Sequence, residues 1–206
     1  MILPFLAAHW LDLTTTLLGL AYILLEYRAS RLMWVVGLAM QVLGVVLYYE
    51  KGLYADCGME FYYIAMTVYG FLAWRSAQTK GAPDAPTRRE RPVTRIPLRT
   101  AAVWSLLTLA LWALIWWILA TKTDSTVPVA DSFTTALSMA GMWALARKYL
   151  EQWFIWIAVD AVTCALYFHK DIPFKASLYG LYVVIAVAGY LRWRRLMHEA
   201  ATAARA

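Results

Sequence analysis

An acidic residue in the middle of an apolar segment is the first feature of this sequence that could do chemistry. Asp160 lies near the centre of the apolar segment 150–168. Helical spacing places Trp153, Trp156 and Thr163 on the same face. Two flat aromatic rings beside one carboxylate suit a flat, positively charged ring, which needs stacking, cation–π attraction and a counter-charge. Ionisable groups in hydrocarbon usually face a bundle interior or a wet cavity, so this face predicts a binding site for a small cation.

A second stripe of polar and aromatic residues follows helical spacing in the segment 55–75. It contains Glu60, Tyr63 and Thr67, and Glu60 adds a second carboxylate. The alternative interpretation is that both acids are protonated or hydrogen-bonded packing residues and that the aromatic rings are core or interfacial belt. Three further tryptophans, close to the predicted inner ends of their helices, are interpreted as interfacial anchors: Trp34, Trp74 and Trp193.

The elements that must position these residues are long apolar helices. Of the 206 residues, 62% are hydrophobic and only 16% are charged, which is too apolar for an ordinary soluble domain. Stretches such as AAVWSLLTLALWALIWWILA do not alternate as the strands of a membrane barrel do. Apolar blocks of about 20 residues match the length of a transmembrane helix. They predict an all-α polytopic membrane protein with seven helices, at 6–25, 32–50, 55–75, 99–120, 130–148, 150–168 and 174–194.

Basic residues are distributed unevenly between the loops of this predicted topology. The net charge is +6, and fifteen of the nineteen Lys and Arg residues follow the first, third, fifth and seventh helices. Cytoplasmic loops collect Lys and Arg, so the N-terminus is expected outside and the C-terminus in the cytoplasm. The basic charge therefore reflects topology, and a nucleic-acid partner is not expected. The first helix lacks a basic leader and contains Asp12, so no cleavable signal peptide is predicted.

An internal repeat divides the chain. A shift of 119 residues without a gap places residues 12–75 on residues 131–194, with 17 identities in 64 positions. Gln41 then corresponds to Asp160, so each half presents one polar group at similar depth. The chain crosses the membrane four times between the start of the first predicted helix and the start of the fifth, so both repeats enter the membrane from the same side and are parallel. Parallel repeats occur in transporters, whose substrate sites lie near the middle of the membrane between the repeats. The predicted domains are a first repeat (1–75), a basic cytoplasmic linker (76–98), a passive central linker helix (99–120), a second repeat (130–195) and a cytoplasmic tail (196–206).

No catalytic set or cofactor motif accompanies these residues. Cys57 and Cys164 show no metal-ligand spacing, and neither a Walker motif nor a phosphate-cradling glycine loop is present. No cofactor or metal site is therefore predicted, and the chain is not expected to be an enzyme. Two other functions stay open: an intramembrane enzyme that acts on a lipid or quinone through Glu60 or Asp160 as acid or base, and a receptor that binds its ligand without net flux.

Three segments resemble a known family, the nicotinamide riboside transporters (PnuC family) among the Pnu-type vitamin transporters, which are related to the SWEET sugar transporters. The segment RKYLEQWFIWIAVD, residues 147–160, looks like the family's cytoplasmic loop and tryptophan helix. The segment EFYYIAMTVYGFLAW, residues 60–74, and the pair Asp131 and Ser132 support the resemblance. Membership implies seven helices in a 3+1+3 arrangement and facilitated diffusion by alternating access in the bacterial inner membrane. It also implies trapping of the vitamin by a cytoplasmic kinase. The expected partners are the lipid bilayer and a small vitamin, and a homo-oligomer is compatible with them.

Two departures from the family pattern bear on the substrate. The family carries Trp-x-x-x-Asn where this chain has Trp156 and Asp160, and it carries Gln at the position of Glu60. Both changes add a carboxylate. Nicotinamide riboside, the substrate of the family, is cationic, so an added carboxylate is compatible with it. Thiamine is also cationic, and its aminopyrimidine can donate to a carboxylate, as a thiamine-specific (PnuT-like) member would require. Neutral riboflavin is a third choice.

Overall fold

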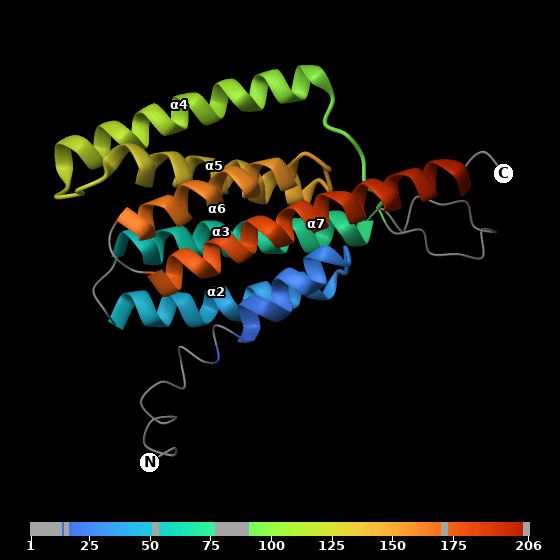
Figure 1. The fold of residues 1–206 in the computed structure, drawn as a ribbon, viewed down its shortest axis with the longest axis horizontal. Coiled ribbons are helices and arrows are strands. Elements are labelled where there is room, and N and C mark those ends of the chain that lie inside the picture. The colour runs from blue at the N-terminus through green and yellow to red at the C-terminus, as the bar shows by residue number, and fades with distance from the viewer. Residues whose placement is uncertain (1–13, 15–16, 51–53, 77–90, 170–172, 204–206) are drawn as a thin grey trace, which may run out of the picture. The chain divides into compact units, whose positions relative to one another are not determined.

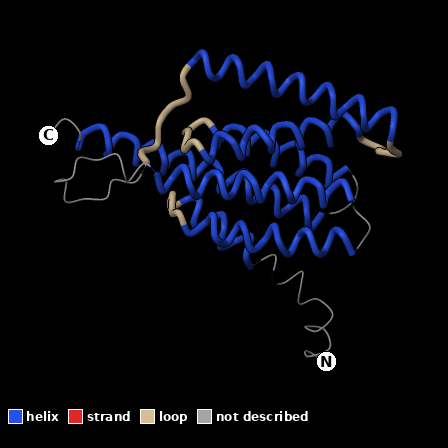
Figure 2. Tube along the Cα trace, turned by 180° about the vertical axis from the view of Figure 1, so that it is seen from behind, coloured by secondary structure: helices blue, strands red, loops and turns tan. Residues whose placement is uncertain are grey.

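A computed structural model describes residues 14, 17–50, 54–76, 91–169 and 173–203. Helices account for nearly all of these residues, and no strand is present among them (Figure 2). The chain divides into two compact units, residues 1–90 and residues 91–206. The boundary falls before the central helix, which therefore belongs to the second unit.

The first unit contains the helix Leu17–Tyr27, α2 (Leu32–Glu50) and α3 (Tyr54–Ser76). α2 and α3 pack along each other. The helix Leu17–Tyr27 ends in a tight turn in which Ala29 has a positive φ of 54°. Its backbone is closed by hydrogen bonds from Ala29 N to Glu26 O (2.8 Å) and from Ser30 N to Leu25 O (2.9 Å). This turn reverses the chain into α2.

The second unit contains α4 (Leu98–Lys122), α5 (Pro128–Ala146), α6 (Gln152–His169) and α7 (Pro173–Ala203). α5 packs against both α4 and α6, and α6 packs against α7 (Figure 1). Proline stands at the first position of α5 and of α7, where its fixed φ suits a helix and its missing N–H would have no partner in the helix. α5 contains eight buried residues, whereas α4 contains none. Because α4 is apolar all round, its free surface suits lipid.

Two aromatic contacts join α4 to α5, one at Trp112 and one at Trp104. Trp112 Nε1 donates to Ser132 Oγ at 3.1 Å. Trp104 stacks on Trp143 with ring centroids 3.9 Å apart and an interplanar angle of 26°. The sequence predicted a passive linker helix; α4 is instead a bonded part of the second unit.

The segment 93–96, which we call the strap, joins the start of α4 to the α5–α6 turn. Thr94 N donates to Lys148 O at 3.2 Å, and Leu150 N donates to Thr94 O at 2.9 Å. Ile96 N donates to a Glu151 carboxylate oxygen at 2.9 Å. Val93 is buried beside these bonds. Part of the predicted linker 76–98 is therefore ordered structure, and its residues 77–90 lie outside the described part of the chain.

The turn before α2 and the turn between α5 and α6 have the same backbone geometry, as the internal repeat predicts. Lys148, which corresponds to Ala29, has a φ of 58°. Its backbone N donates to Leu145 O at 2.8 Å, and Tyr149 N donates to Ala144 O at 3.0 Å, which reproduces both bonds of the first turn. A positive φ is strained for any residue with a side chain. Its occurrence at both matched positions shows that the two turns have the same backbone path.

The helix bounds agree with an all-α polytopic membrane protein. Three described helices are long and apolar enough to span a membrane by themselves: Leu32–Tyr49, Leu98–Lys122 and Ala176–Thr202. α2 has the bounds that the sequence predicted. α7 continues to Ala203, beyond the predicted end at 194, so most of the predicted tail 196–206 is helical. The beginning of the first predicted helix, 6–13, lies outside the described residues.

Candidate functional site

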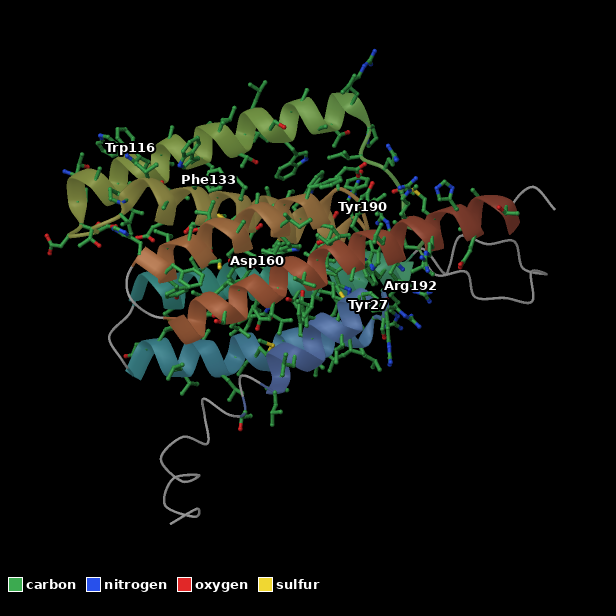
Figure 3. All side chains as sticks on the ribbon, in the orientation of Figure 1. Tyr27, Trp116, Phe133, Asp160, Tyr190 and Arg192 are labelled. Carbon is green, nitrogen blue, oxygen red and sulfur yellow. The ribbon has the colours of Figure 1, made fainter. Side chains whose placement is uncertain are left out.

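The predicted site residues fall into two sets, one in each unit. Gln41 lies on α2, and Glu60, Tyr63 and Thr67 lie on α3. The second set lies entirely on α6, with Asp160 near its middle (Figure 3), and comprises Trp153, Trp156, Asp160 and Thr163.

Paired tryptophans fix the register of the two helix pairs. Trp34 and Trp74 meet edge to face with ring centroids 5.4 Å apart at 89°, and Trp153 and Trp193 do so at 5.6 Å and 90°. All four rings are at most 1% exposed. The interpretation of Trp34, Trp74 and Trp193 as interfacial anchors was therefore wrong, because their rings are enclosed by protein. Trp153, predicted to face a ligand, has the same packing environment.

Two glycines make room for these rings. The six-membered ring of Trp34 lies where a side chain at Gly70 would begin, and the ring of Trp153 does the same at Gly189. Gly70 and Gly189 are themselves matched by the repeat. Each tryptophan therefore inserts against the bare backbone of the third helix of its repeat, and this contact sets how α2 lies on α3 and how α6 lies on α7.

Asp160 is the polar centre of the second set. Its side chain is 9% exposed, and no hydrogen bond to it forms within the described part of the chain. Tyr182 of α7 is the phenol with which the Asp160 charge interacts. Thr163 uses its hydroxyl hydrogen within α6, where it donates to Val159 O at 2.8 Å. The carboxylate of Asp160 is thus left with acceptor capacity that the described residues of its own unit do not use.

Trp156 lies one helical turn before Asp160 on α6. Its ring packs on Gly141 of α5, where an added Cβ would be 3.3 Å from Cε2 and from Cζ2. Its indole Nε1 is buried and has no hydrogen-bond partner among the described residues. Side chains four residues apart on a helix are neighbours. One turn of α6 therefore presents an unused donor and an unused acceptor side by side.

In the first unit the corresponding polar groups are used internally. Thr67 is 2% exposed, and its Oγ1 lies 3.0 Å from Gln41 Oε1, to which it donates. The Glu60 carboxyl group lies directly over Gly44 of α2, where an added Cβ would be 2.8 Å from its Cδ. Tyr63 meets Tyr62 edge to face at 5.7 Å. The structure therefore gathers these predicted residues on the packed faces of α2 and α3.

Three residues that line up with these sets were not identified from the sequence: Gly141, Tyr182 and Ala186. The repeat carried the signal for two of them, because Tyr182 matches Tyr63 and Ala186 matches Thr67. Gly141 matches Tyr22, whose ring packs on Gly37 of α2 as Trp156 packs on Gly141. The large and small partners have thus exchanged places between the units, which residue identity alone does not reveal.

The described side chains offer no metal site, since no group of three or more His, Cys, Asp or Glu is gathered there. The two thiols instead bond to backbone carbonyls of the neighbouring helix. Cys57 Sγ lies 3.8 Å from Val45 O, and Cys164 Sγ lies 3.1 Å from Ala176 O. The repeat matches Cys57 with Ala176 and Val45 with Cys164. The same helix contact is therefore made from opposite sides in the two units.

Comparison with known proteins gives one family and one fold. The family model described as "Nicotinamide mononucleotide transporter" matches residues 9–195. The riboflavin/roseoflavin transporter RibM of Streptomyces davaonensis is 26% identical over 193 residues, with 89% of this chain and 84% of that protein covered. The nicotinamide riboside transporter PnuC of Escherichia coli is 21% identical over 208 residues, with the same coverage.

A crystal structure of the vitamin B3 transporter PnuC has the same fold. It superposes with a TM-score of 0.72 and covers 96% of this chain and 86% of that chain. The sequence identity is 20%, so this likeness concerns the fold alone. It confirms the predicted all-α fold.

Proposed function

The chain belongs to the nicotinamide mononucleotide transporter family, and from this premise we propose that it carries an unphosphorylated, cationic B vitamin across the membrane. The family's characterised relatives transport vitamins and are not enzymes. The two leading substrates are nicotinamide riboside and thiamine. Both are flat, positively charged heterocycles.

The observation that carries this proposal is that the buried carboxylate of Asp160 receives no hydrogen bond from the described residues. A carboxylate at the middle of a membrane helix is costly, and its cost falls when a partner is bound. The second unit supplies no hydrogen bond to it from the described residues. A cationic ring would provide the missing counter-charge, and Trp156 would provide an aromatic face one turn away. A neutral ligand would leave the charge uncompensated.

The donor and acceptor on this turn of α6 also match the edges of both candidates. The buried Trp156 Nε1 can donate to a ring nitrogen or a carboxamide oxygen. The Asp160 carboxylate can accept from an amino group or a carboxamide nitrogen. Thiamine presents an aminopyrimidine and nicotinamide riboside presents a carboxamide, so the pair suits either vitamin.

The other predicted site residues have different roles in this proposal: some contact the substrate and one positions a helix. In the first unit Glu60 and Tyr63 are the proposed contacts, because the Gln41 oxygen already accepts from Thr67. In the second unit Thr163 retains an acceptor after its bond to Val159. Trp153 contributes by holding α6 in register against α7.

Riboflavin is the alternative to a cationic vitamin, and the similarity to the riboflavin/roseoflavin transporter RibM favours it. Its neutral isoalloxazine ring can stack on Trp156 but gives Asp160 no counter-charge. A comparison of substrates therefore separates a cationic vitamin from riboflavin by a single property, the charge of the ring.

Transport itself is proposed to be facilitated diffusion by alternating access, with a cytoplasmic kinase that traps the vitamin. We propose the bacterial inner membrane as its location, with the N-terminus outside. The fifteen Lys and Arg residues assigned to the inner loops support this orientation.

Uptake into vesicles tests the proposal. Purified protein is reconstituted in vesicles that contain either the matching vitamin kinase with ATP or buffer, and labelled nicotinamide riboside, thiamine and riboflavin are added separately. The expected result is accumulation of one cationic vitamin only when its kinase is inside. Equilibration without a kinase is expected to stop at equal concentrations. Failure of all three vitamins to enter above the level of empty vesicles would contradict the proposal.

A further inference from the structure

The two repeats treat the same polar position in opposite ways. Gln41 of α2 and Asp160 of α6 correspond under the shift of 119 residues. Gln41 receives a hydrogen bond from Thr67, whereas Asp160 receives none within the described part of the chain. The difference lies in the partner helix, because the residue that matches Thr67 is Ala186.

The correspondence between the two helix pairs is close enough to compare single side chains. The tryptophan pairs agree within 0.2 Å in centroid distance, at 5.4 and 5.6 Å, and both are perpendicular, at 89° and 90°. Gln41 and Asp160 both lie seven residues after the buried tryptophan of their helix. Thr67 and Ala186 both lie three residues before the glycine that receives that ring. α6 and α7 therefore share the register of α2 and α3.

The shared register predicts that Ala186 faces Asp160, as Thr67 faces Gln41 in the first unit. Ala186 is 1% exposed, as expected for a residue on the packed face of α7. Tyr182, four residues earlier on the same face, interacts electrostatically with Asp160. A methyl group at 186 cannot donate a hydrogen bond, so the carboxylate keeps its acceptor capacity.

We propose that Ala186 is a specificity-determining residue: by withholding a donor from Asp160, it keeps the carboxylate open to a cationic heterocycle. In the first unit the hydroxyl of Thr67 closes the equivalent position. Ala186 does not touch the substrate in this account; it acts through Asp160. The inference rests on the proposed function and deepens it, because it names the charge of the substrate as the selected property.

A purely structural role for Ala186 makes a different prediction. Small residues allow close helix packing, and any larger side chain at 186 would then be equally harmful. Thr and Val have nearly the same shape, but only Thr carries a hydroxyl. The comparison of these two substitutions therefore separates hydrogen bonding from crowding.

The test uses the full-length protein with Ala186→Thr and the matched control Ala186→Val. Affinity for nicotinamide riboside and thiamine is measured by titration, and thermal unfolding is measured without any vitamin. We expect Ala186→Thr to bind the transported cation at least about tenfold more weakly than Ala186→Val, since a hydrogen bond to a charged group must be given up on binding. We also expect Ala186→Thr to unfold at a higher temperature than Ala186→Val, because the carboxylate gains a partner.

Two results would overturn the inference. One is equal affinity of the Thr and Val variants for a vitamin that the unmodified protein binds. The other is equal unfolding temperature of the two variants without vitamin. If the unmodified protein binds no vitamin, the proposed function fails, while the unfolding comparison still decides whether residue 186 controls the partner of Asp160.

Discussion

Substitution of Gly189 by alanine perturbs the contact that sets the register of α6 on α7. The new methyl group would overlap the six-membered ring of Trp153, at atoms Cη2, Cζ2 and Cζ3. Neither side can yield easily, because Trp153 is 1% exposed and is held edge-on by Trp193. Gly70→Ala would have the same effect on Trp34 in the first unit. We therefore expect two matched losses of stability.

The magnitude follows from two opposing effects. Alanine is favoured over glycine in a helix by up to about 1 kcal/mol. Overpacking of a tight interior costs about 1 to 3 kcal/mol, occasionally more. Gly58 in α3 isolates the first effect, since no side chain or backbone lies within 4 Å of a Cβ placed there. Relative to Gly58→Ala, in which the propensity gain is the same and cancels, we expect Gly70→Ala and Gly189→Ala each to lower the free energy of unfolding by about 1 to 3 kcal/mol.

Chemical unfolding in mild detergent, followed by tryptophan fluorescence, measures these differences. A rescue variant sharpens the result. Phenylalanine lacks the far ring atoms of tryptophan, so Trp153→Phe should restore part of the stability that Gly189→Ala removes. The reasoning is refuted if Gly189→Ala is as stable as Gly58→Ala. It is also refuted if only one of the two repeats is sensitive.

Three further predictions concern other parts of the chain. Gln152 is fully buried, its two amide atoms have no hydrogen-bond partner among the described residues, and it matches the equally buried Met33. Gln152→Met should therefore stabilise the protein by about 1 to 3 kcal/mol in the same unfolding assay. A loss of stability would show that the amide has a partner. Glu151→Ala should raise the rate of proteolysis near the strap, because Ile96 N loses its acceptor; an unchanged cleavage rate would count against a fastened strap. Green fluorescent protein fused to the C-terminus should fluoresce and alkaline phosphatase fused there should be inactive, and the reverse pattern would contradict a cytoplasmic C-terminus.

Most of the architecture could be predicted from the sequence because it depends on periodic and local signals. Apolar length located the helices, and the predicted bounds of α2 are those observed. The end of α7 was placed too early, since the apolar stretch stops near 194 while the helix continues through residues that favour helix, such as Ala, Arg and Leu. Apolarity marks where a helix lies in the membrane, and helix propensity marks where it ends.

The packing of the tryptophans could not be predicted, because it depends on which ring meets which glycine. The spacing of Trp153, Trp156 and Asp160 suggested one ligand-facing stripe. The structure separates them: Trp153 inserts against Gly189 of α7, and Trp156 packs on Gly141 of α5. Both glycines are distant in sequence from the rings that they receive, and a helical face alone does not distinguish the two neighbours.

The strap escaped prediction for a similar reason. The predicted linker that contains it, residues 76–98, is polar and contains several prolines, which is typical of a mobile linker. Order comes from backbone bonds to the α5–α6 turn, at Lys148 and Leu150, and from the carboxylate of Glu151. Such bonds depend on the position of a distant turn and leave little trace in residue identity.

The most direct test of the account is the effect of Asp160→Asn on binding of charged and neutral vitamins. Asparagine keeps the shape of the side chain and removes its charge. The account predicts that the unmodified protein binds nicotinamide riboside or thiamine, and that Asp160→Asn weakens this binding at least about tenfold, or about 1.4 kcal/mol, without weakening any binding of riboflavin. Unchanged affinity of Asp160→Asn for the cationic vitamin, or binding of riboflavin alone by the unmodified protein, would contradict it.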